Sequence, residues 1–213
     1  MTKIEDGIDD DIDDEDEIKV ILVGEISTGK TSLINTAIGL EFKDKVESTH
    51  ASSIITTIIT IQNKQYNINI WDTIGQEKYR AVTKIFMKDA KIVILVYDIT
   101  RLETFNQLDF WFESVQNVLG ENAIIGIVGN KSDLSDQEEV TENIAQEYAN
   151  KKGVPFSYTT AKDPKYFRDF LELLLKIYIN KLENNDIKDE MDSQKYDEIT
   201  TEKTFKKRKQ KCC

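Results

Sequence analysis

The sequence predicts an α/β fold in which a mostly parallel sheet is covered by helices on both faces. Short apolar runs, of the kind that form buried strands, alternate along the chain with segments of helical periodicity. Two β-branched stretches, 54–61 and 66–71, are separated by the polar residues 62–65 and are typical of a hairpin. Strands that are joined through helices cross over in the right-handed sense and run parallel.

The predicted strands and helices follow one another in pairs. The first apolar run, 18–23, ends at Gly24 and precedes a helical pattern at 31–38. After the hairpin come strand 92–97 with helix 103–118, strand 123–128 with helix 138–151, and strand 154–158 with helix 165–182. Sheets of this kind bind ligands at the carboxyl ends of their strands, so functional residues are expected directly after the strands.

We interpret residues 18–182 as one folded domain between two polar tails. Residues 1–17 hold ten acidic residues and one lysine, which predicts a disordered acidic tail. Residues 183–213 are expected to form a flexible tail that ends in a basic stretch and two cysteines. The net charge of −11 argues against a nucleic-acid binder. A core without cysteine and the lack of a long apolar run favour a cytoplasmic protein.

A phosphate-binding pattern follows the first strand. Residues 24–31, GEISTGKT, fit GxxxxGK[ST] between a strand and a helix. Glycines let backbone N–H groups approach a phosphate closely, and the helix N-terminus adds partial positive charge. We expect Lys30 to reach the β- and γ-phosphates and the Thr31 hydroxyl to ligate Mg²⁺. The predicted nucleotide contacts here are Gly24, Ser27, Thr28, Gly29, Lys30, Thr31 and Ser32.

A second motif, DTIGQ at 72–76, follows the end of the hairpin. At this position Asp72 could hold a water of Mg²⁺, and the backbone N–H of Gly75 could meet the γ-phosphate. Gln76 could orient an attacking water. Gly75 and Gln76, together with the lysine of the first motif, are therefore the predicted catalytic residues.

Residues that suit a guanine base follow the next two strands. The Asp133 carboxylate in NKSD, residues 130–133, can accept from the adjacent N1–H and amino group of guanine. Adenine would leave this carboxylate unpaired. Asn130 could tie the loop together, and the stem of Lys131 could lie along the base face. Three further candidates, Thr160, Ala161 and Lys162, form a weaker motif after the next strand. The backbone N–H of Ala161 could meet guanine O6.

In this order and spacing the motifs resemble the Ras superfamily of small GTPases, and within it the Rab family. WDTIGQEKYR at 71–80 is similar to the Rab stretch WDTAGQERFR, and LVYDIT at 95–100 and GNKSD at 129–133 match that family almost letter for letter. The resemblance covers about residues 18–182 and the terminal Cys-Cys. It implies the P-loop NTPase fold of small G proteins, with a six-stranded sheet. It also implies a switch that binds GTP or GDP with Mg²⁺, hydrolyses GTP and regulates vesicle traffic.

The resemblance assigns two further nucleotide contacts. Thr49, 18 residues after Thr31, matches the switch threonine that ligates Mg²⁺ in the triphosphate state. Phe42, eleven residues after Thr31, matches the aromatic side chain that covers the guanine edge; ordinary packing of a loop residue is its alternative. The alternatives to Thr49, if the loop is rearranged, are Ser52, Ser53 and Thr56.

The carboxyl terminus resembles a common Rab ending. By this resemblance Cys212 and Cys213 would both carry geranylgeranyl chains, which together give stable anchoring. The nearby basic residues would add attraction to the anionic cytosolic face of an endomembrane or the plasma membrane. The family's usual partners are an exchange factor, an activating protein, effectors, a dissociation inhibitor and a prenylation escort.

Two segments depart from the family's pattern. Ile26 stands where the superfamily often has Gly, Ser or Ala, and THASSI at 49–54 replaces the Rab pattern TIGVDF. A side chain that points from position 26 toward the γ-phosphate could crowd Gln76, whereas a tilted loop would turn it outward. A GTP-binding recruitment platform with little hydrolysis is therefore the alternative function. A general P-loop ATPase is a more distant one.

We predict slow intrinsic GTP hydrolysis, because the β-branched Ile26 would crowd the catalytic glutamine. Single-turnover hydrolysis of preloaded GTP measures this rate on the Mg²⁺-loaded protein. An intrinsic rate like that of ordinary Rab proteins would contradict the prediction.

Overall fold

The structure, a computed structural model, describes residues 17–43, 53–73, 80–120 and 123–184, except for the side chains of 80–83. It divides into two units, residues 1–174 and 175–213. In the second unit, the described residues 175–184 are helical. Among the described residues, no helix combines the length and the apolar character needed to cross a membrane. The sheet and the candidate site both lie in the first unit.

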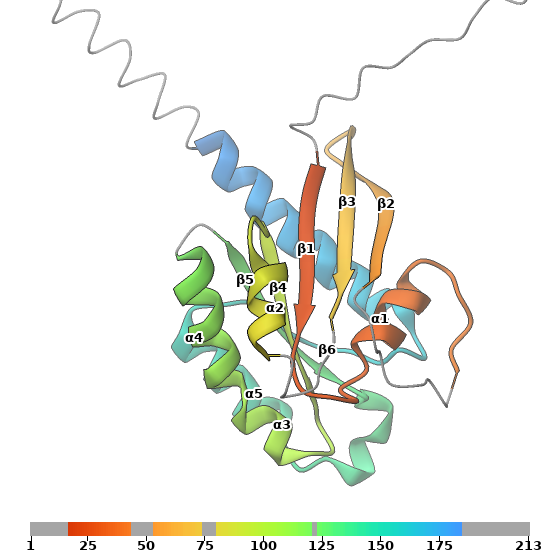
Figure 1. Ribbon diagram of the computed structural model, residues 1–213. Coiled ribbons are helices and arrows are strands. Elements are labelled where there is room, and N and C mark those ends of the chain that lie inside the picture. The colour runs from red at the N-terminus through yellow and green to blue at the C-terminus, as the bar shows by residue number, and fades with distance from the viewer. Residues whose placement is uncertain (1–16, 44–52, 74–79, 121–122, 185–213) are drawn as a thin grey trace, which may run out of the picture. The chain divides into compact units, whose positions relative to one another are not determined.

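Six strands form one sheet in the order β2-β3-β1-β4-β5-β6 (Figure 1). All neighbours from β3 to β6 in this order pair in parallel. The predicted mostly parallel α/β fold is therefore confirmed. The parallel strands are β1 (Glu17–Val23), β3 (Lys64–Asp72), β4 (Ile92–Asp98), β5 (Ile124–Asn130) and β6 (Phe156–Tyr158).

The edge strand β2 (Ser53–Ile61) runs antiparallel to β3 and forms the predicted hairpin. Its turn consists of Gln62 and Asn63, whose φ angles are 52° and 66°. Two successive positive φ angles are those of a type I′ turn, whose twist matches that of the flanking strands. The turn is shorter than the pattern suggested, because Ile61 and Lys64 already pair across the ladder.

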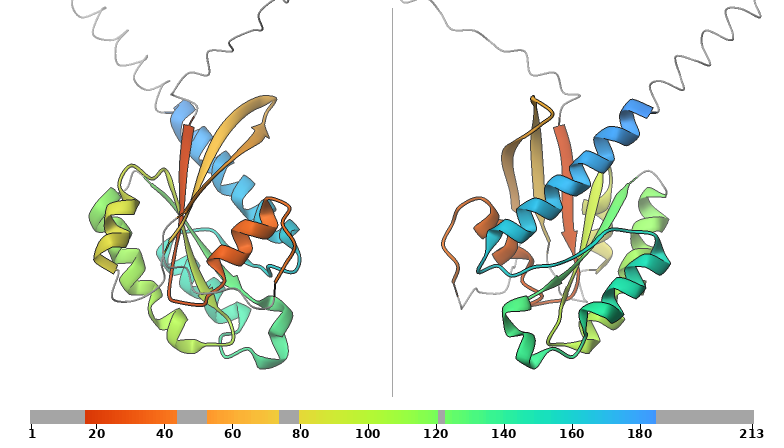
Figure 2. Two further views of the ribbon diagram at one scale, coloured as in Figure 1. Left: turned by 45° about the vertical axis from the view of Figure 1, so that its right-hand side comes forward. Right: turned by 180° about the vertical axis from the view of Figure 1, so that it is seen from behind.

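Helices cover both faces of the sheet. Figure 2 shows α1 on the opposite side of the sheet from α4 and α5. On the α4 and α5 side, β1, β4 and β5 contribute Ile21, Val93 and Ile125 to one buried cluster that includes Met87 and Trp111. The helices of the first unit are α1 (Lys30–Ala37), α2 (Arg80–Met87), α3 (Leu102–Asn106), α4 (Leu108–Leu119), α5 (Glu142–Lys152) and the first part of a helix over 164–184.

Two of the predicted helices have different bounds. The helix predicted at 103–118 is interrupted at Gln107, which separates α3 from α4. The helix predicted at 138–151 begins at Glu142 instead. The N–H groups of Glu139 and Val140 both donate to the Ile99 carbonyl, at 2.8 and 3.2 Å, and Val140 is fully buried. This contact with Ile99, the residue after β4, overrides the helix propensity of the acidic residues Glu138 and Glu139.

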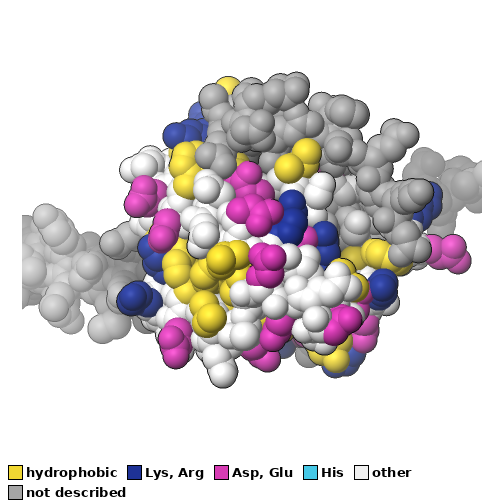
Figure 3. All heavy atoms as spheres, turned by 90° about the horizontal axis from the view of Figure 1, so that it is seen from below, with side chains coloured by type: hydrophobic (Ala, Val, Ile, Leu, Met, Phe, Trp, Pro, Cys, Tyr) yellow, Lys and Arg dark blue, Asp and Glu magenta, His cyan; other side chains and the backbone are white. Residues whose placement is uncertain are grey.

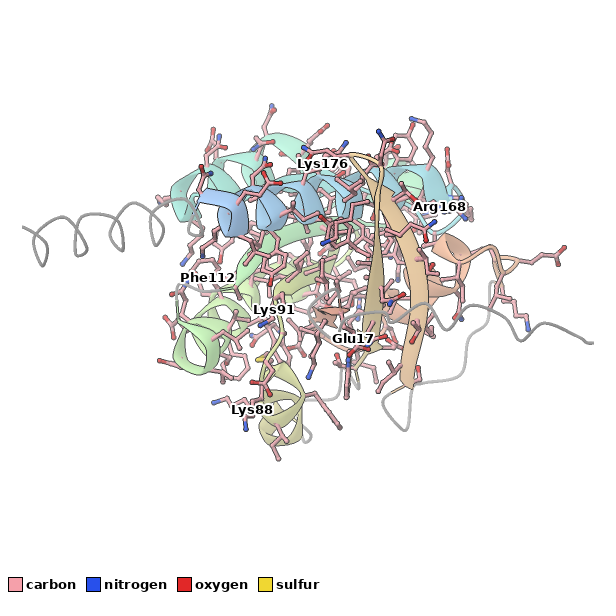
Figure 4. All side chains as sticks on the ribbon, turned by 90° about the horizontal axis from the view of Figure 1, so that it is seen from above. Glu17, Lys88, Lys91, Phe112, Arg168 and Lys176 are labelled. Atoms are coloured by element: carbon pink, nitrogen blue, oxygen red, sulfur yellow. The ribbon has the colours of Figure 1, made fainter. Side chains whose placement is uncertain are left out.

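At the amino-terminal ends of the parallel strands, which form the amino-terminal edge of the sheet, hydrogen bonds connect β1 to the segment between α2 and β4. Figure 4 looks onto this edge and labels Glu17, at the start of β1, with Lys88 and Lys91 between α2 and β4. The Lys19 ammonium donates to the Lys88 carbonyl at 2.8 Å, and the Lys91 N–H donates to the Lys19 carbonyl at 2.9 Å. These bonds hold the end of α2 beside β1.

Gly126 provides a test of helix packing against the sheet. A Cβ atom at this position would lie 2.8 Å from Leu174 Cδ1 and 2.9 Å from Phe170 Cζ, both on the last helix. We expect Gly126→Ala to lower the free energy of unfolding by about 1–3 kcal/mol through overpacking. Urea unfolding followed by circular dichroism measures this change. Ile144→Ala, at a half-exposed position of α5, serves as the control and should stay within about 0.5 kcal/mol. A variant as stable as the unaltered protein would contradict the packing.

Candidate nucleotide-binding site

The predicted site residues gather at the carboxyl ends of the parallel strands, which form one end of the sheet and are called its carboxyl edge below. Loops that follow β1, β3, β5 and β6 all begin at this edge, because these strands run in the same direction. Figure 3 looks onto this edge, where acidic, basic and hydrophobic side chains lie side by side. One end of the candidate site is formed by the loop after β1, and the other by the loops after β5 and β6.

Two glycines of the loop after β1 are required by their surroundings. Gly24 has a φ of 147° and Gly29 a φ of 91°, which L side chains rarely adopt. A Cβ atom on Gly24 would collide with the Val96 carbonyl of β4, and one on Gly29 with the Asn130 side-chain amide. The glycine spacing of the motif therefore follows from the close approach of the loop to β4 and β5.

Ser27 holds the loop in a strained conformation. Its φ of 61° lies in the left-handed region, which costs a non-glycine residue about 1–3 kcal/mol. The residues on either side are anchored by side chains. The Ile26 carbonyl accepts from Arg101 Nη2 at 2.8 Å, and the Thr28 carbonyl accepts from Asn130 Nδ2 at 2.8 Å. These two anchors maintain the turn at Ser27.

Lys30 places a desolvated positive charge inside the loop. Its ammonium donates to the carbonyls of Gly24 at 2.9 Å and Glu25 at 2.8 Å, and the residue is buried. Burial lowers the pKa of Lys30 to about 8, against the opposing charges of Asp72 and Glu25. Such a charge, set among backbone groups at the start of α1, suits an anionic phosphate. Ser32, two residues after Lys30, is half-buried, and its carbonyl accepts from Thr36 Oγ1 at 3.0 Å.

Thr31 and Asp72 provide oxygen atoms that fit Mg²⁺. Thr31 Oγ1 donates to Asp72 Oδ2 at 2.6 Å, and Asp72 is buried at the end of β3. Burial raises the pKa of Asp72, while the Thr31 bond and the Lys30 charge act in the opposite direction. Asp72 Oδ1 is also buried, and no hydrogen bond satisfies it within the described part of the chain. A hydroxyl beside a carboxylate with an unsatisfied oxygen matches the hard ligands that Mg²⁺ prefers, directly or through water.

Asn130 joins the loop after β1 to the other end of the site. Its side-chain nitrogen donates to the Thr28 carbonyl, as given above, and its Oδ1 accepts from Thr159 Oγ1 at 3.3 Å. The Ser132 N–H donates to the Thr159 carbonyl at 3.0 Å. The loops after β1, β5 and β6 are therefore connected through one buried side chain.

Asp133 is held by two residues of the loop after β6. Thr160 Oγ1 donates to Asp133 Oδ1 at 2.6 Å, and Lys162 Nζ lies 2.7 Å from Oδ2. Burial opposes ionisation of Asp133, but these two partners outweigh it and lower the pKa of this carboxyl. Lys162 Nζ also lies 5.8 Å from the centre of the Phe42 ring, and the neighbouring Ala161 is buried. The structure thus brings Phe42 to the same end of the site as Asp133.

Lys131 contacts a carboxylate that the motifs did not single out. Lys131 Nζ lies 2.5 Å from Asp98 Oδ2, and the same oxygen accepts from Arg101 Nε at 3.0 Å. The Asp98 side chain is buried, which opposes its ionisation, yet the bonds from Lys131 and Thr100 lower the pKa of this group. Asp98 directly follows an apolar run, and that position at a strand end is the signal that could have identified it.

Several predicted residues lie outside the described part of the chain. They are Thr49, Gly75, Gln76, Cys212 and Cys213. Two of the alternatives to Thr49 are described and belong to β2. Ser53 pairs with Asp72, and Thr56 Oγ1 donates to Asn69 Oδ1 at 2.8 Å.

Comparison with known proteins places the chain in a family. The family model described as "Ras family" matches residues 19–180. Ras-related protein Rab-21 of Geodia cydonium is 39% identical over 160 residues, which cover 75% of this chain and 70% of the relative. Ras-related protein Rab11C of Nicotiana tabacum is 37% identical over 166 residues, 76% of this chain and 75% of the relative. Ras-related protein Rab-21 of Homo sapiens is 38% identical over 156 residues, 73% of this chain and 69% of the relative. The chain belongs to the Ras family and is a Rab-like small GTPase.

Proposed function

We propose that this protein is a guanine-nucleotide switch that binds GTP and GDP with Mg²⁺ and hydrolyses GTP. The observation that carries the proposal is the Asn130 bridge, which joins the loop around Lys30 to the loop of Asp133. Because of this bridge, the phosphates of one nucleotide could contact Lys30 while its base contacts Asp133.

Recognition of guanine is proposed for the Asp133 end. The lowered pKa keeps Asp133 ionised at neutral pH, so its oxygens act only as acceptors. Guanine presents two adjacent donors, its N1–H and its 2-amino group, whereas adenine presents an acceptor at N1. A nucleotide with adenine would therefore leave a carboxylate unpaired, and this loss disfavours ATP. We assign Phe42, Lys131, Thr160, Ala161 and Lys162 to the same base site.

Phosphate binding is proposed for the loop after β1. Lys30 would exchange the carbonyls of Gly24 and Glu25 for β- and γ-phosphate oxygens, and backbone N–H groups would surround them. Thr31, Asp72 and Thr49 would hold Mg²⁺, which when bound offsets the negative charge of the phosphates. Gly75 would fix the γ-phosphate, and Gln76 would orient the attacking water. In such a reaction the protein contributes positioning and charge stabilisation more than covalent chemistry.

Membership of the Ras family as a Rab-like protein and the carboxyl-terminal residues support the proposal of a role on membranes. All three relatives are named as Ras-related Rab proteins, and the basic stretch 206–211 precedes Cys212 and Cys213. We propose that prenyl chains on both cysteines anchor the protein at a cytosolic membrane face, where it regulates vesicle traffic. Its partners would be an exchange factor, an activating protein, effectors, a dissociation inhibitor and a prenylation escort.

One observation favours a second candidate function. Ile26 is half-buried in the phosphate loop, directly before the strained Ser27. If its side chain crowds the catalytic glutamine, the protein would bind GTP and recruit partners while scarcely hydrolysing the nucleotide.

The base assignment predicts a selective loss of affinity in Asp133→Ala. Hydrogen bonds to charged groups contribute about 1.5–3 kcal/mol each, so the loss of two should raise the Kd for GDP by about 100-fold or more. Isothermal titration with GDP and ADP in the presence of Mg²⁺ measures this loss. ADP affinity, weak from the start, should not fall further.

Asp136→Ala is the matched control, because it removes an exposed carboxylate from the same 3₁₀ helix (Ser132–Gln137). This control should bind GDP like the unaltered protein. An unchanged GDP affinity in Asp133→Ala would contradict the assignment.

A further inference from the structure

Arg101 connects the two ends of the site along a second route, beside that of Asn130. Its guanidinium donates through Nη2 to the Ile26 carbonyl at 2.8 Å and through Nε to Asp98 Oδ2 at 3.0 Å. The same Asp98 oxygen lies 2.5 Å from Lys131 Nζ in the base loop. A planar guanidinium presents several donors in fixed directions, so it can hold the carbonyl and the carboxylate at once.

The contact with Ile26 determines how one peptide unit of the phosphate loop is oriented. In a trans peptide the C=O and the following N–H point in opposite directions, and the described residues contain no cis peptide. The bond from Arg101 therefore directs the Ser27 N–H away from Arg101. The two preceding carbonyls, of Gly24 and Glu25, accept from Lys30 instead. The Ile26 carbonyl therefore points toward Arg101, whereas the carbonyls of Gly24 and Glu25 point toward Lys30.

Asp98 does not depend on Arg101 for its hydrogen bonds. Its Oδ1 accepts from the N–H and the hydroxyl of Thr100, at 3.0 and 2.7 Å, and its Oδ2 retains Lys131. The Arg101 side chain is about one-third exposed, at 31%. Arg101 Nη1 also lies 3.9 Å from Oε1 of the exposed Glu103. Removal of Arg101 therefore leaves no buried charge unpaired here, and the loss that bears on the site is the hydrogen bond to the Ile26 carbonyl.

We propose that Arg101 is a positioning residue, an inference that rests on the proposed nucleotide-binding function. Arg101 orients the peptide between Ile26 and Ser27 for the β- and γ-phosphates. It also connects this peptide, through Asp98, to Lys131 in the loop after β5. The motifs contain no signal for this role, because Arg101 lies outside all of them.

The test compares two nucleotides that differ in the phosphates they offer to this peptide. In full-length Arg101→Gln, with Mg²⁺ present, the Kd for GDP should rise about tenfold. This is the loss expected if the peptide N–H of Ser27 no longer donates to the charged β-phosphate. The Kd for GMP should change less than about twofold, because GMP ends at the α-phosphate. Both constants come from competition against a fluorescent GDP analogue.

Arg168→Gln is the matched control. Arg168 Nε also donates to a backbone carbonyl, that of Ala37 at 2.6 Å, at the far end of α1 from the phosphate loop. This control should leave the GDP and GMP constants unchanged. Arg101→Lys retains the charge without the fork, so it should show the same selective loss to a smaller extent.

The inference is overturned if Arg101→Gln binds GDP as tightly as the unaltered protein. It is equally overturned if the GDP and GMP constants rise by the same factor, because that would indicate general loosening of the fold. If the unaltered protein shows no preference for GDP over ADP, the proposed function fails first, and the inference fails with it. The unaltered protein therefore distinguishes the two failures.

Discussion

A single buried amide, that of Asn130, determines whether this edge of the sheet can act as one site. It donates to the Thr28 carbonyl and accepts from Thr159, so three loops that are distant in the sequence share one fixed point. Gly29 has to be glycine because this amide occupies the space that a Cβ atom would need. This contact connects the loop of Lys30, after β1, to the loop of Asp133, after β5.

Each charged side chain of the site has fixed surroundings in the protein itself, and these surroundings suit a ligand of a particular kind. Lys30 is desolvated and surrounded by carbonyls, which leaves a cation that a phosphate can satisfy better. Asp72 has a buried oxygen without a hydrogen bond among the described residues, next to the Thr31 hydroxyl. Asp133 is kept ionised by Lys162 and Thr160. One end of the site therefore favours anionic groups with a metal, and the other favours hydrogen-bond donors.

The sequence was sufficient for the elements whose signals are local. The apolar runs predicted where the parallel strands lie along the chain, because strands buried on both faces need continuous apolar residues, as in β4. The glycine spacing predicted a phosphate-binding loop after the first strand. The positive φ angles of Gly24 and Gly29 explain the two glycines, and phosphate binding stays a prediction. The start of α5 was predicted wrongly because Val140 is held by Ile99, a contact that no local pattern records. Arg101 was missed for the same reason, since its partner Ile26 lies on another loop. Asp98 did have a local signal, its position after an apolar run, but its contact with Lys131 is not recorded by any local pattern.

The most direct test of the account is titration of nucleotide-free, full-length protein with GDP and with ADP under identical Mg²⁺ concentrations. The two ligands carry the same phosphates and differ in the base alone. A site that joins a phosphate loop to a guanine-reading carboxylate should bind GDP at least about a hundredfold more tightly than ADP. Equal affinities for the two nucleotides would contradict the account.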